Sequence, residues 1–320
     1  MKHGTQCSTG DGAISYGYLT FIKLGGSLLS DKTKKETLRR EVLDRIAREI
    51  HEARSRSPEA KIVVGHGSGS FGHIPAAKHG TRDGVSGTAK WRGFCEVSEA
   101  ALRLNRLVTK ALLESGVPAM SLQPSASAVC RDGTLVSLAT GPIKAALDAG
   151  LVPVIHGDVA FDEERGGTVA STEEIFSYLA REMSPRWLLF AGETEGVYGV
   201  DGAVVKEITS ANFSSLEEAL RGSRGTDVTG GMASKVREML SLAEDLPETQ
   251  IRILSGLNPG DVRRALCLAV VRDGVTEDEW ATGSTKSAPG NRGSDARDGC
   301  RVLGTVIKAK ASSDGDVSAG

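Results

Sequence analysis

Residues 19–27, LTFIKLGGS, combine a short apolar run with a pair of glycines directly after it. The run has the length and composition of a buried strand, and the glycines mark a turn at its end. The same arrangement recurs along the chain, where short apolar runs alternate with longer amphipathic stretches of helical period. This alternation is typical of an α/β fold built on a mainly parallel sheet.

The predicted elements cover most of the chain. Strands are expected at Leu19–Leu24, Lys61–Gly65, Ala119–Leu122, Leu151–Ile155, Trp187–Ala191, Ile251–Leu254 and Leu303–Lys308. Helices are expected at Thr37–Ala53, Thr88–Glu114, Pro142–Ala149, Thr172–Met183, Leu216–Leu220, Gly231–Glu244 and Pro259–Val271. Hairpins are expected at Asp158–Val169 and Val197–Val205. Segments 1–17, 276–299 and 311–320 are expected to be disordered, because their polar composition buries too little apolar surface to offset the entropy of ordering.

The composition excludes several classes of partner. Thirty-nine basic and 41 acidic side chains give the 320-residue chain a formal net charge of -2, so neither nucleic acid nor a membrane is expected as a partner. No apolar run is long enough to span a bilayer or to form the core of a signal peptide. The five cysteines are odd in number and scattered, which favours free thiols in a reducing compartment. We therefore expect a cytoplasmic protein.

Three glycine-rich segments follow predicted strands or open predicted helices. They are IKLGGS at residues 22–27 with Lys32 shortly after, GHGSGSFGH at residues 65–73, and DVTGGMASK at residues 227–235. Glycines allow backbone N–H groups to approach phosphate oxygens, and a helix N-terminus adds a favourable field. Lys23 and Lys235 supply mobile positive charge, and His73 can donate to an anionic acceptor. The pattern predicts a site that handles phosphate groups.

The second segment also matches the dinucleotide fingerprint GxGxxG, at Gly67, Gly69 and Gly72. That fingerprint requires a helix at the loop and an acidic residue at the end of a second strand. Residues 73–88 are expected to be polar and broken, with no strand to carry Asp83. A nicotinamide-dependent oxidoreductase is therefore a poor alternative. The absence of GxxxxGK[ST] excludes a P-loop kinase.

Histidines offer a second alternative, a metal site. A cluster of His66, His73, His79 and His156 is conceivable, but no pair has a recognised helical ligand spacing.

Taken together, the motifs resemble the amino acid kinase superfamily and, within it, the isopentenyl phosphate kinases. The resemblance covers residues 20–266 and 304–307. Its motifs fall in family order: KLGGSLLSDK, VVGHGSGSFGHIPAAKHG, RGFCEV, SLQPSA, LVPVIHGDV, SYLA and TDVTGGMASKV. It implies a three-layer sandwich of the amino acid kinase type, with an acceptor lobe over 18–180 and a nucleotide lobe over 181–310. It also implies a homodimer.

The resemblance further implies ATP as the phosphoryl donor, with Mg2+, and a small-molecule phosphate as the acceptor. The residues that it implies for catalysis are Lys23, Lys32, His73 and Lys235. Those implied to bind ATP are Lys23, Gly25, Gly26, Ser27, Gly69, Glu193, Thr229, Gly230 and Lys235. Those implied to bind the acceptor are Gly67, Ser68, His73, Phe94, Val97, Gly157, Asp158, Val159, Val169 and Thr172, with the apolar ones lining a pocket for a prenyl tail. No protein ligand to a metal is assigned.

The sequence departs from the family pattern at a few positions. Ser68 and Thr172 stand where glycine is usual, and Glu193 and Glu195 where aspartate is usual; the segment 276–299 is also atypical. These departures bear on the acceptor more than on phosphoryl transfer. The expected reaction is ATP-dependent phosphorylation of isopentenyl phosphate to isopentenyl diphosphate, in the alternative mevalonate route of isoprenoid biosynthesis. The alternatives are a kinase of fosfomycin or another small phosphate or phosphonate, and a non-catalytic nucleotide-binding protein.

Overall fold

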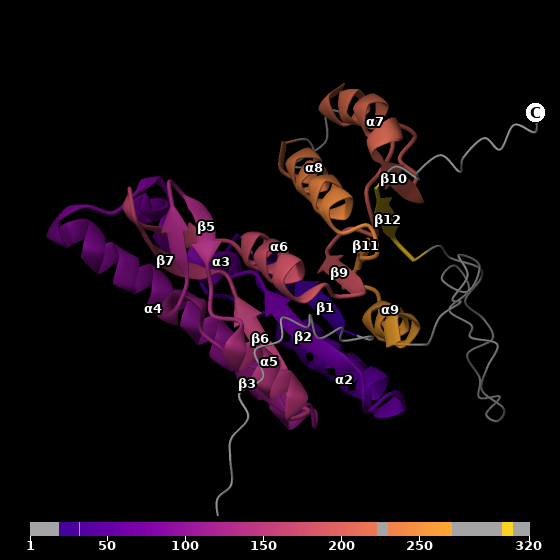
Figure 1. Ribbon diagram of the computed structural model, residues 1–320, viewed down its shortest axis with the longest axis horizontal. Helices are drawn as coiled ribbons and strands as arrows, with labels where there is room; N and C mark the ends of the chain where they lie inside the picture. Colours follow the sequence, from indigo (N-terminus) through magenta and orange to yellow (C-terminus); the bar gives the residue numbers. More distant parts are fainter. Residues whose placement is uncertain (1–18, 32, 223–229, 271–302, 310–320) are drawn as a thin grey trace, which may run out of the picture.

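An eight-stranded sheet forms the centre of the computed structural model (Figure 1), which describes residues 19–31, 33–222, 230–270 and 303–309. In spatial order the strands are β10 (Glu207–Thr209), β12 (Thr305–Lys308), β11 (Gln250–Ser255), β9 (Trp187–Gly192), β1 (Leu19–Leu24), β2 (Lys61–His66), β6 (Val152–His156) and β3 (Ala119–Ser121). Every neighbouring pair is parallel except β11 and β12. The mainly parallel sheet predicted from the sequence is confirmed.

Helices cover both faces of this sheet. One face packs against α1 (Gly26–Leu29), α2 (Arg40–Arg56), α4 (Gly87–Glu114) and α9 (Asp261–Val270). The other packs against α5 (Gly141–Asp148), α6 (Thr172–Met183), α7 (Ser210–Gly222) and α8 (Gly230–Asp245). The result is the predicted three-layer sandwich, with one apolar core on each side of the sheet.

The two cores explain why β1 is apolar along most of its length. Leu19 and Phe21 belong to the core under α6 and α8, whereas Ile22 and Leu24 belong to the core under α2 and α9. Strands buried on both faces lose the alternation of apolar and polar residues. Because side chains of the same parity share a face, Lys23 points to the side of the sheet that α6 and α8 cover.

A smaller sheet lies beside the main one, in the part of the molecule that carries α3 (Gly69–His79) and the start of α4 (Figure 1). Its strands, in spatial order, are β5 (Thr134–Ser137), β4 (Val129–Arg131), β7 (Asp158–Asp162) and β8 (Gly166–Ala170). β7 and β8 are antiparallel neighbours, so the hairpin predicted over this part of the chain is confirmed.

All seven predicted strands and all seven predicted helices are present, with ends displaced by a few residues for most and more at the short predicted helix that became α7. The second predicted hairpin, Val197–Val205, is reduced to a single bridge between Tyr198 and Val204. The short elements α1, β4, β5 and β10 were not predicted. The predicted disordered segments fall outside the described residues.

The largest correction concerns α3, because the residues after the second glycine segment were expected to be broken. They form a helix despite Pro75, and the helix ends at Gly80 in the left-handed conformation. Glycine and proline lower helix propensity, but packing of α3 against α4 overrides it. One argument against a dinucleotide site is therefore wrong. The other stands, because α3 leads through a short 3-10 turn into α4 and not into a strand.

Among the described residues, no helix is both long enough and apolar enough to cross a membrane.

Candidate active site

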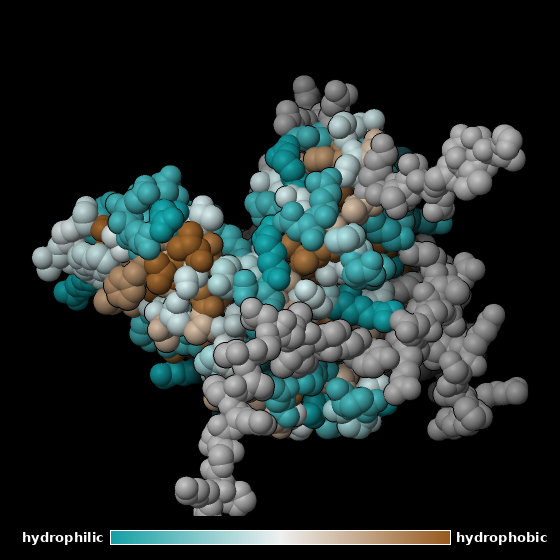
Figure 2. All heavy atoms as spheres, viewed as in Figure 1, coloured by the Kyte–Doolittle hydropathy of each residue, from teal (hydrophilic) through white to brown (hydrophobic). Residues whose placement is uncertain are grey.

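The candidate active site lies at the carboxyl edge of the main sheet, where glycine amides continue the hydrogen bonding beyond the strands. From β6 towards β9, the amides donate as follows: Gly157 to the carbonyl of His66 (3.3 Å), Gly67 to that of Leu24 (3.0 Å) and Gly25 to that of Ala191 (2.8 Å). The first two glycine segments and the Gly157 turn therefore meet at one edge. This is where ligands bind in open parallel sheets. Figure 2 shows the surface hollowed between the part with β5 and β7 and the part with α7 and α8.

The first two glycine loops touch each other through their backbones. A Cβ atom on Gly26 would lie 2.5 Å from the amide nitrogen of Gly69, which has a φ of 50°. The hydroxyl of Ser30 joins the loops, because it donates to the Gly26 carbonyl (2.9 Å) and accepts from the Ser70 amide (2.8 Å). Side chains larger than hydrogen would separate the loops. Their amides are thus gathered into one small region.

Two lysines from distant parts of the chain share one carboxylate. The Nζ of Lys23 lies 2.8 Å from Oε1 of Glu173, and the Nζ of Lys235 lies 3.6 Å from the same oxygen. The side chain of Lys23 is 9% exposed and that of Lys235 is 50% exposed. Burial would raise the pKa of Glu173, but the two ammonium groups outweigh it and hold the pKa at about 2. The carboxylate therefore stays ionised and keeps the two cations together.

His73 lies in α3, one turn after Gly69, and its side chain is exposed. Its Nδ1 lies 2.8 Å from the carbonyl oxygen of Gly69. A carbonyl only accepts, so Nδ1 carries a proton, and Nε2 remains for a ligand. Because Nδ1 already carries a proton, Nε2 can donate to an anion only when the ring is an imidazolium. The backbone thus fixes which nitrogen of His73 is left open to a ligand.

The predicted prenyl pocket forms a small apolar cluster between α4 and the β7–β8 hairpin. Phe94, Val97 and Val159 are buried in it, together with Val85, and the half-buried Val169 packs against them. Trp91 and Phe161 extend the cluster outwards, with ring centroids 5.3 Å and 5.5 Å from that of Phe94. The four predicted residues are brought together. They pack against one another, and Phe94 and Val159 also line a cavity of about 420 Å³ beside α4.

The comparisons with known proteins agree with this geometry. The model of the amino acid kinase family matches residues 19–255. The chain belongs to the amino acid kinase family. It is 40% identical to the isopentenyl phosphate kinase of Haloferax volcanii over 77% of this chain and 98% of that protein. It is 37% identical to that of Methanocaldococcus jannaschii over 68% of this chain and 85% of that protein. A solved isopentenyl phosphate kinase structure, 27% identical, covers 91% of this chain and all of its own with a TM-score of 0.68.

Two of the residues predicted to bind the acceptor substrate, Thr172 and Asp158, are hydrogen-bonded to neighbouring elements of the fold. Thr172 is buried, and its hydroxyl donates to the carbonyl of His66 (2.7 Å). Asp158 is buried, and its Oδ1 accepts from the hydroxyl of Ser98 (3.0 Å). The structure therefore connects both side chains to neighbouring elements rather than to an open surface. Gly67 and Ser68 are partly exposed at the sheet edge.

The residues predicted on the nucleotide side are only partly described. Glu193 follows β9 and forms an ion pair with Arg39 (2.9 Å). Gly230 is the first residue of α8, the helix that carries Lys235. Gly25, Gly26 and Ser27 are partly exposed after β1. The predicted residues Lys32 and Thr229 lie outside the described part of the chain.

Sequence reasoning missed Glu173, Arg39 and Asn105. A lysine inside an apolar strand requires a counter-charge, and this requirement was the available signal for Glu173. Nothing in the sequence links Lys23 to one of the 41 acidic residues, since the contact depends on α6 crossing the sheet edge. Asn105 lies in the middle of α4 and contacts the His66 ring, which no sequence pattern indicates.

The metal-cluster alternative finds no support in the described residues. His66 and His156 stack on each other with ring centroids 5.6 Å apart, whereas His79 pairs with Glu96 (2.8 Å). No group of three or more histidine, cysteine or acidic side chains gathers there in a way that holds a metal ion.

Proposed function

We propose that this protein is an isopentenyl phosphate kinase, which transfers the γ-phosphoryl group of ATP to isopentenyl phosphate. The observation that carries the proposal is the Lys23–Glu173–Lys235 cluster beside two interlocked glycine loops, in a chain whose relatives at 34–40% identity bear that name. These relatives do not favour a fosfomycin-like acceptor or a non-catalytic nucleotide-binding protein.

In the proposed reaction, an oxygen of the acceptor phosphate attacks the γ-phosphorus of ATP. A new P–O bond forms, the bond from the γ-phosphorus to the β–γ bridging oxygen breaks, and ADP leaves with the electron pair. The attacking oxygen is already anionic, so the reaction needs positioning and charge neutralisation and no protein base. Lys23 and Lys235 are suited to offset the charge on the moving phosphoryl group. Glu173 keeps both ammonium groups in place.

Mg2+ is proposed to enter with ATP. The nucleotide's phosphate oxygens and water suit it as ligands, since Mg2+ in kinases is usually held by substrate phosphates and few carboxylates. Among the described residues the carboxylate nearest the lysines, Glu173, is already engaged by them.

His73 and the apolar cluster are proposed to select the acceptor. The imidazolium of His73 would donate from Nε2 to the acceptor phosphate, one turn of helix from the loop that binds it. Phe94, Val97 and Val159 would enclose the five-carbon tail. A compact polar phosphonate would leave this apolar surface unfilled, which costs binding free energy.

The test is ADP release with a panel of acceptors: isopentenyl phosphate, fosfomycin, N-acetylglutamate and carbamate. Isopentenyl phosphate should have by far the highest kcat/KM. His73→Ala should nearly abolish transfer and leave ATP binding intact. His73→Gln should retain more activity than His73→Ala, because its amide can still donate a hydrogen bond. A faster reaction with fosfomycin, or an unimpaired His73→Ala variant, would contradict the proposal.

We further propose that the protein is a cytoplasmic homodimer with an acceptor lobe over 18–180 and a nucleotide lobe over 181–310. The three described cysteines, Cys95, Cys130 and Cys267, are free thiols, which suits a reducing compartment. The exposed Leu113 and Met120 lie at the end of α4 and on the edge strand β3. An exposed strand edge with apolar side chains suits pairing with a second copy.

A further inference from the structure

Two fully buried histidines lie side by side at the carboxyl edge of the sheet, and no role in catalysis has been given to either. His66 ends β2, His156 ends β6, and the two residues are register partners in the parallel pair. Their rings stack with an interplanar angle of 11°. Burial, and then the neighbouring histidine, lower the pKa of His66 to about 4, and burial lowers that of His156 to about 4. Both rings are therefore neutral at pH 7.

The hydrogen bonds of the two rings differ completely. The Nδ1 of His66 lies 3.2 Å from the carbonyl oxygen of Gly67, and its Nε2 lies 3.1 Å from the side-chain amide of Asn105. Neither nitrogen of His156 has a hydrogen-bond partner, although its Nε2 is 3.7 Å from the carboxylate of Asp158. His66 is thus held from two sides, and His156 mainly fills space.

The proton on a neutral ring limits how His66 can bond. With one N–H, the ring donates either to Gly67 or to Asn105. If the Asn105 amide turns end for end, both contacts are satisfied: Nδ1 donates to Gly67, and the amide N–H donates to Nε2. The hydroxyl of Ser121, already bonded to the same amide, then donates to the amide oxygen. In that orientation a chain of hydrogen bonds runs from α4 through His66 to the second glycine loop.

The carbonyl of His66 adds two further contacts. It accepts from the amide of Gly157 (3.3 Å) and from the hydroxyl of Thr172 (2.7 Å). Thr172 directly precedes Glu173, the carboxylate between the two lysines. His66 therefore joins four parts of the structure: the second glycine loop at residues 65–73, proposed to bind the acceptor and here called the acceptor loop, the Gly157 turn, the start of α6 and the middle of α4.

We infer that His66 is a positioning residue, whose neutral side chain fixes the backbone of the acceptor loop at Gly67 by hydrogen bonding between that loop and Asn105 of α4. This inference rests on the proposed function for its kinetic consequence. A loop displaced by about 1 Å would misalign the acceptor phosphate and reduce turnover by about a hundredfold. Glu193, proposed to bind ATP, follows β9 on the other side of β1 from His66, so the KM for ATP should change little.

The experiment compares His66→Phe with the matched control His156→Phe. Both variants replace a fully buried, stacked imidazole by a ring of similar shape, but only the first removes hydrogen bonds. We expect His66→Phe to lower kcat/KM for isopentenyl phosphate by about a hundredfold with an unchanged KM for ATP. His156→Phe should retain wild-type kinetics. Equal kinetics in the two variants would overturn the inference.

A double variant separates positioning from stability. Replacing His66 alone leaves one group of the buried Asn105 amide without a partner, whereas replacing both residues can be nearly neutral. His66→Phe/Asn105→Leu should therefore recover much of the thermal stability lost in His66→Phe, while kcat stays low. Recovery of kcat together with stability would mean that His66 has only a structural role.

Hydrogen exchange of the ligand-free protein keeps this inference separate from the proposed function. Peptides covering residues 66–73 should exchange faster in His66→Phe than in His156→Phe, with peptides from α9 unchanged. If wild-type protein fails to phosphorylate isopentenyl phosphate, the proposed function is wrong, and the exchange result alone decides the role of His66. Equal exchange of residues 66–73 in both variants would refute it.

Discussion

Replacing Glu173 by glutamine tests whether one carboxylate organises both lysines. The change keeps the size of the side chain and removes its charge. Lys23, with a side chain only 9% exposed, then loses its counter-ion, and a buried charge without a partner is strongly destabilising. The ammonium groups of Lys23 and Lys235 also lose the carboxylate that holds them close to each other. We expect lower stability and a lower kcat.

The magnitude follows from the acidity of the carboxyl group. The pKa of Glu173 falls from an ordinary 4.5 to about 2, because attraction to Lys23 and Lys235 exceeds the opposing effect of burial. At 1.36 kcal/mol per unit, the ionised carboxylate contributes about 3 kcal/mol to folding. The folded-state pKa is depressed, so this contribution is complete above about pH 4.5 and is lost as the pH falls towards 2.

The assay is urea unfolding of wild type and Glu173→Gln at several pH values, together with kcat at neutral pH. The difference in unfolding free energy should be about 3 kcal/mol at pH 7 and should vanish near pH 2. Glu174→Gln is the matched control. Glu174 is the next residue of the same helix turn and belongs to the capping box with Ser171, in which glutamine is equally accepted. A Glu173→Gln variant as stable and as active as the control would refute the reasoning.

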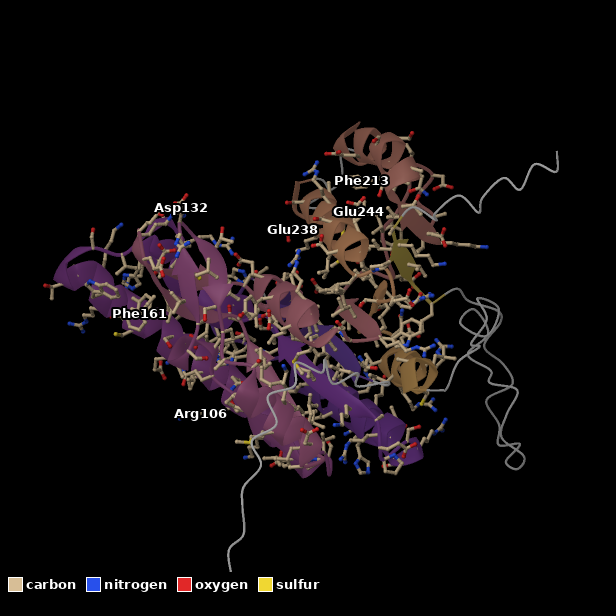
Figure 3. The ribbon with its side chains drawn as sticks, viewed as in Figure 1. Arg106, Asp132, Phe161, Phe213, Glu238 and Glu244 are labelled. Atoms are coloured by element: carbon tan, nitrogen blue, oxygen red, sulfur yellow. The ribbon has the colours of Figure 1, made fainter. Side chains whose placement is uncertain are left out.

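The other predictions concern the two lysines, the contact between the first two glycine loops, and the charge of Glu238. Lys23→Ala and Lys235→Ala should mainly lower kcat, because charge on the phosphoryl group is greatest in the transition state; an effect confined to the KM for ATP would contradict this. Gly26→Ala should sharply reduce both stability and activity, since its Cβ would lie 2.5 Å from a backbone nitrogen, whereas Gly141→Ala, with nothing within 4 Å, should be tolerated in thermal melts. Glu238 lies on α8 (Figure 3), and burial and two acidic neighbours on α6 raise its pKa. Glu238→Gln should therefore stabilise the protein at pH 7 and not at acidic pH, as chemical unfolding would reveal.

Most of the fold could be predicted because its determinants are local. Strands buried on both faces appear as short apolar runs, and the helices between them carry an apolar stripe of helical period. The failure at α3 has an equally clear cause. Gly72 and Pro75 are poor helix formers, and the helix exists because it packs on α4. A tertiary contact of this kind leaves no local pattern.

The residues of the candidate site show the same difference between local patterns and tertiary contacts. Gly25, Gly26, Gly67 and Lys23 could be predicted, because each follows or ends an apolar run where parallel strands place their carboxyl ends together. Glu173 could not, since its role depends on the position of α6 relative to β1. Residues that belong to one loop could be recognised in the sequence, whereas a contact between side chains of different elements, such as Lys23 and Glu173, could not.

Thr172 illustrates how a departure from the family pattern gains meaning from its surroundings. A threonine in place of glycine suggested a change in the surface that meets the acceptor. In the folded protein the side chain faces inward: a Cβ on Gly65 would lie 3.0 Å from its methyl group, and its hydroxyl reaches the carbonyl of His66. The threonine fills the space next to Gly65, at the start of the second glycine loop, and its hydrogen bond connects α6 to β2. A glycine there would lose this hydrogen bond and gain backbone freedom next to Glu173. Thr172 therefore connects α6 to the end of β2 next to Glu173, and the proposed acceptor surface is left to Gly67, Ser68 and His73.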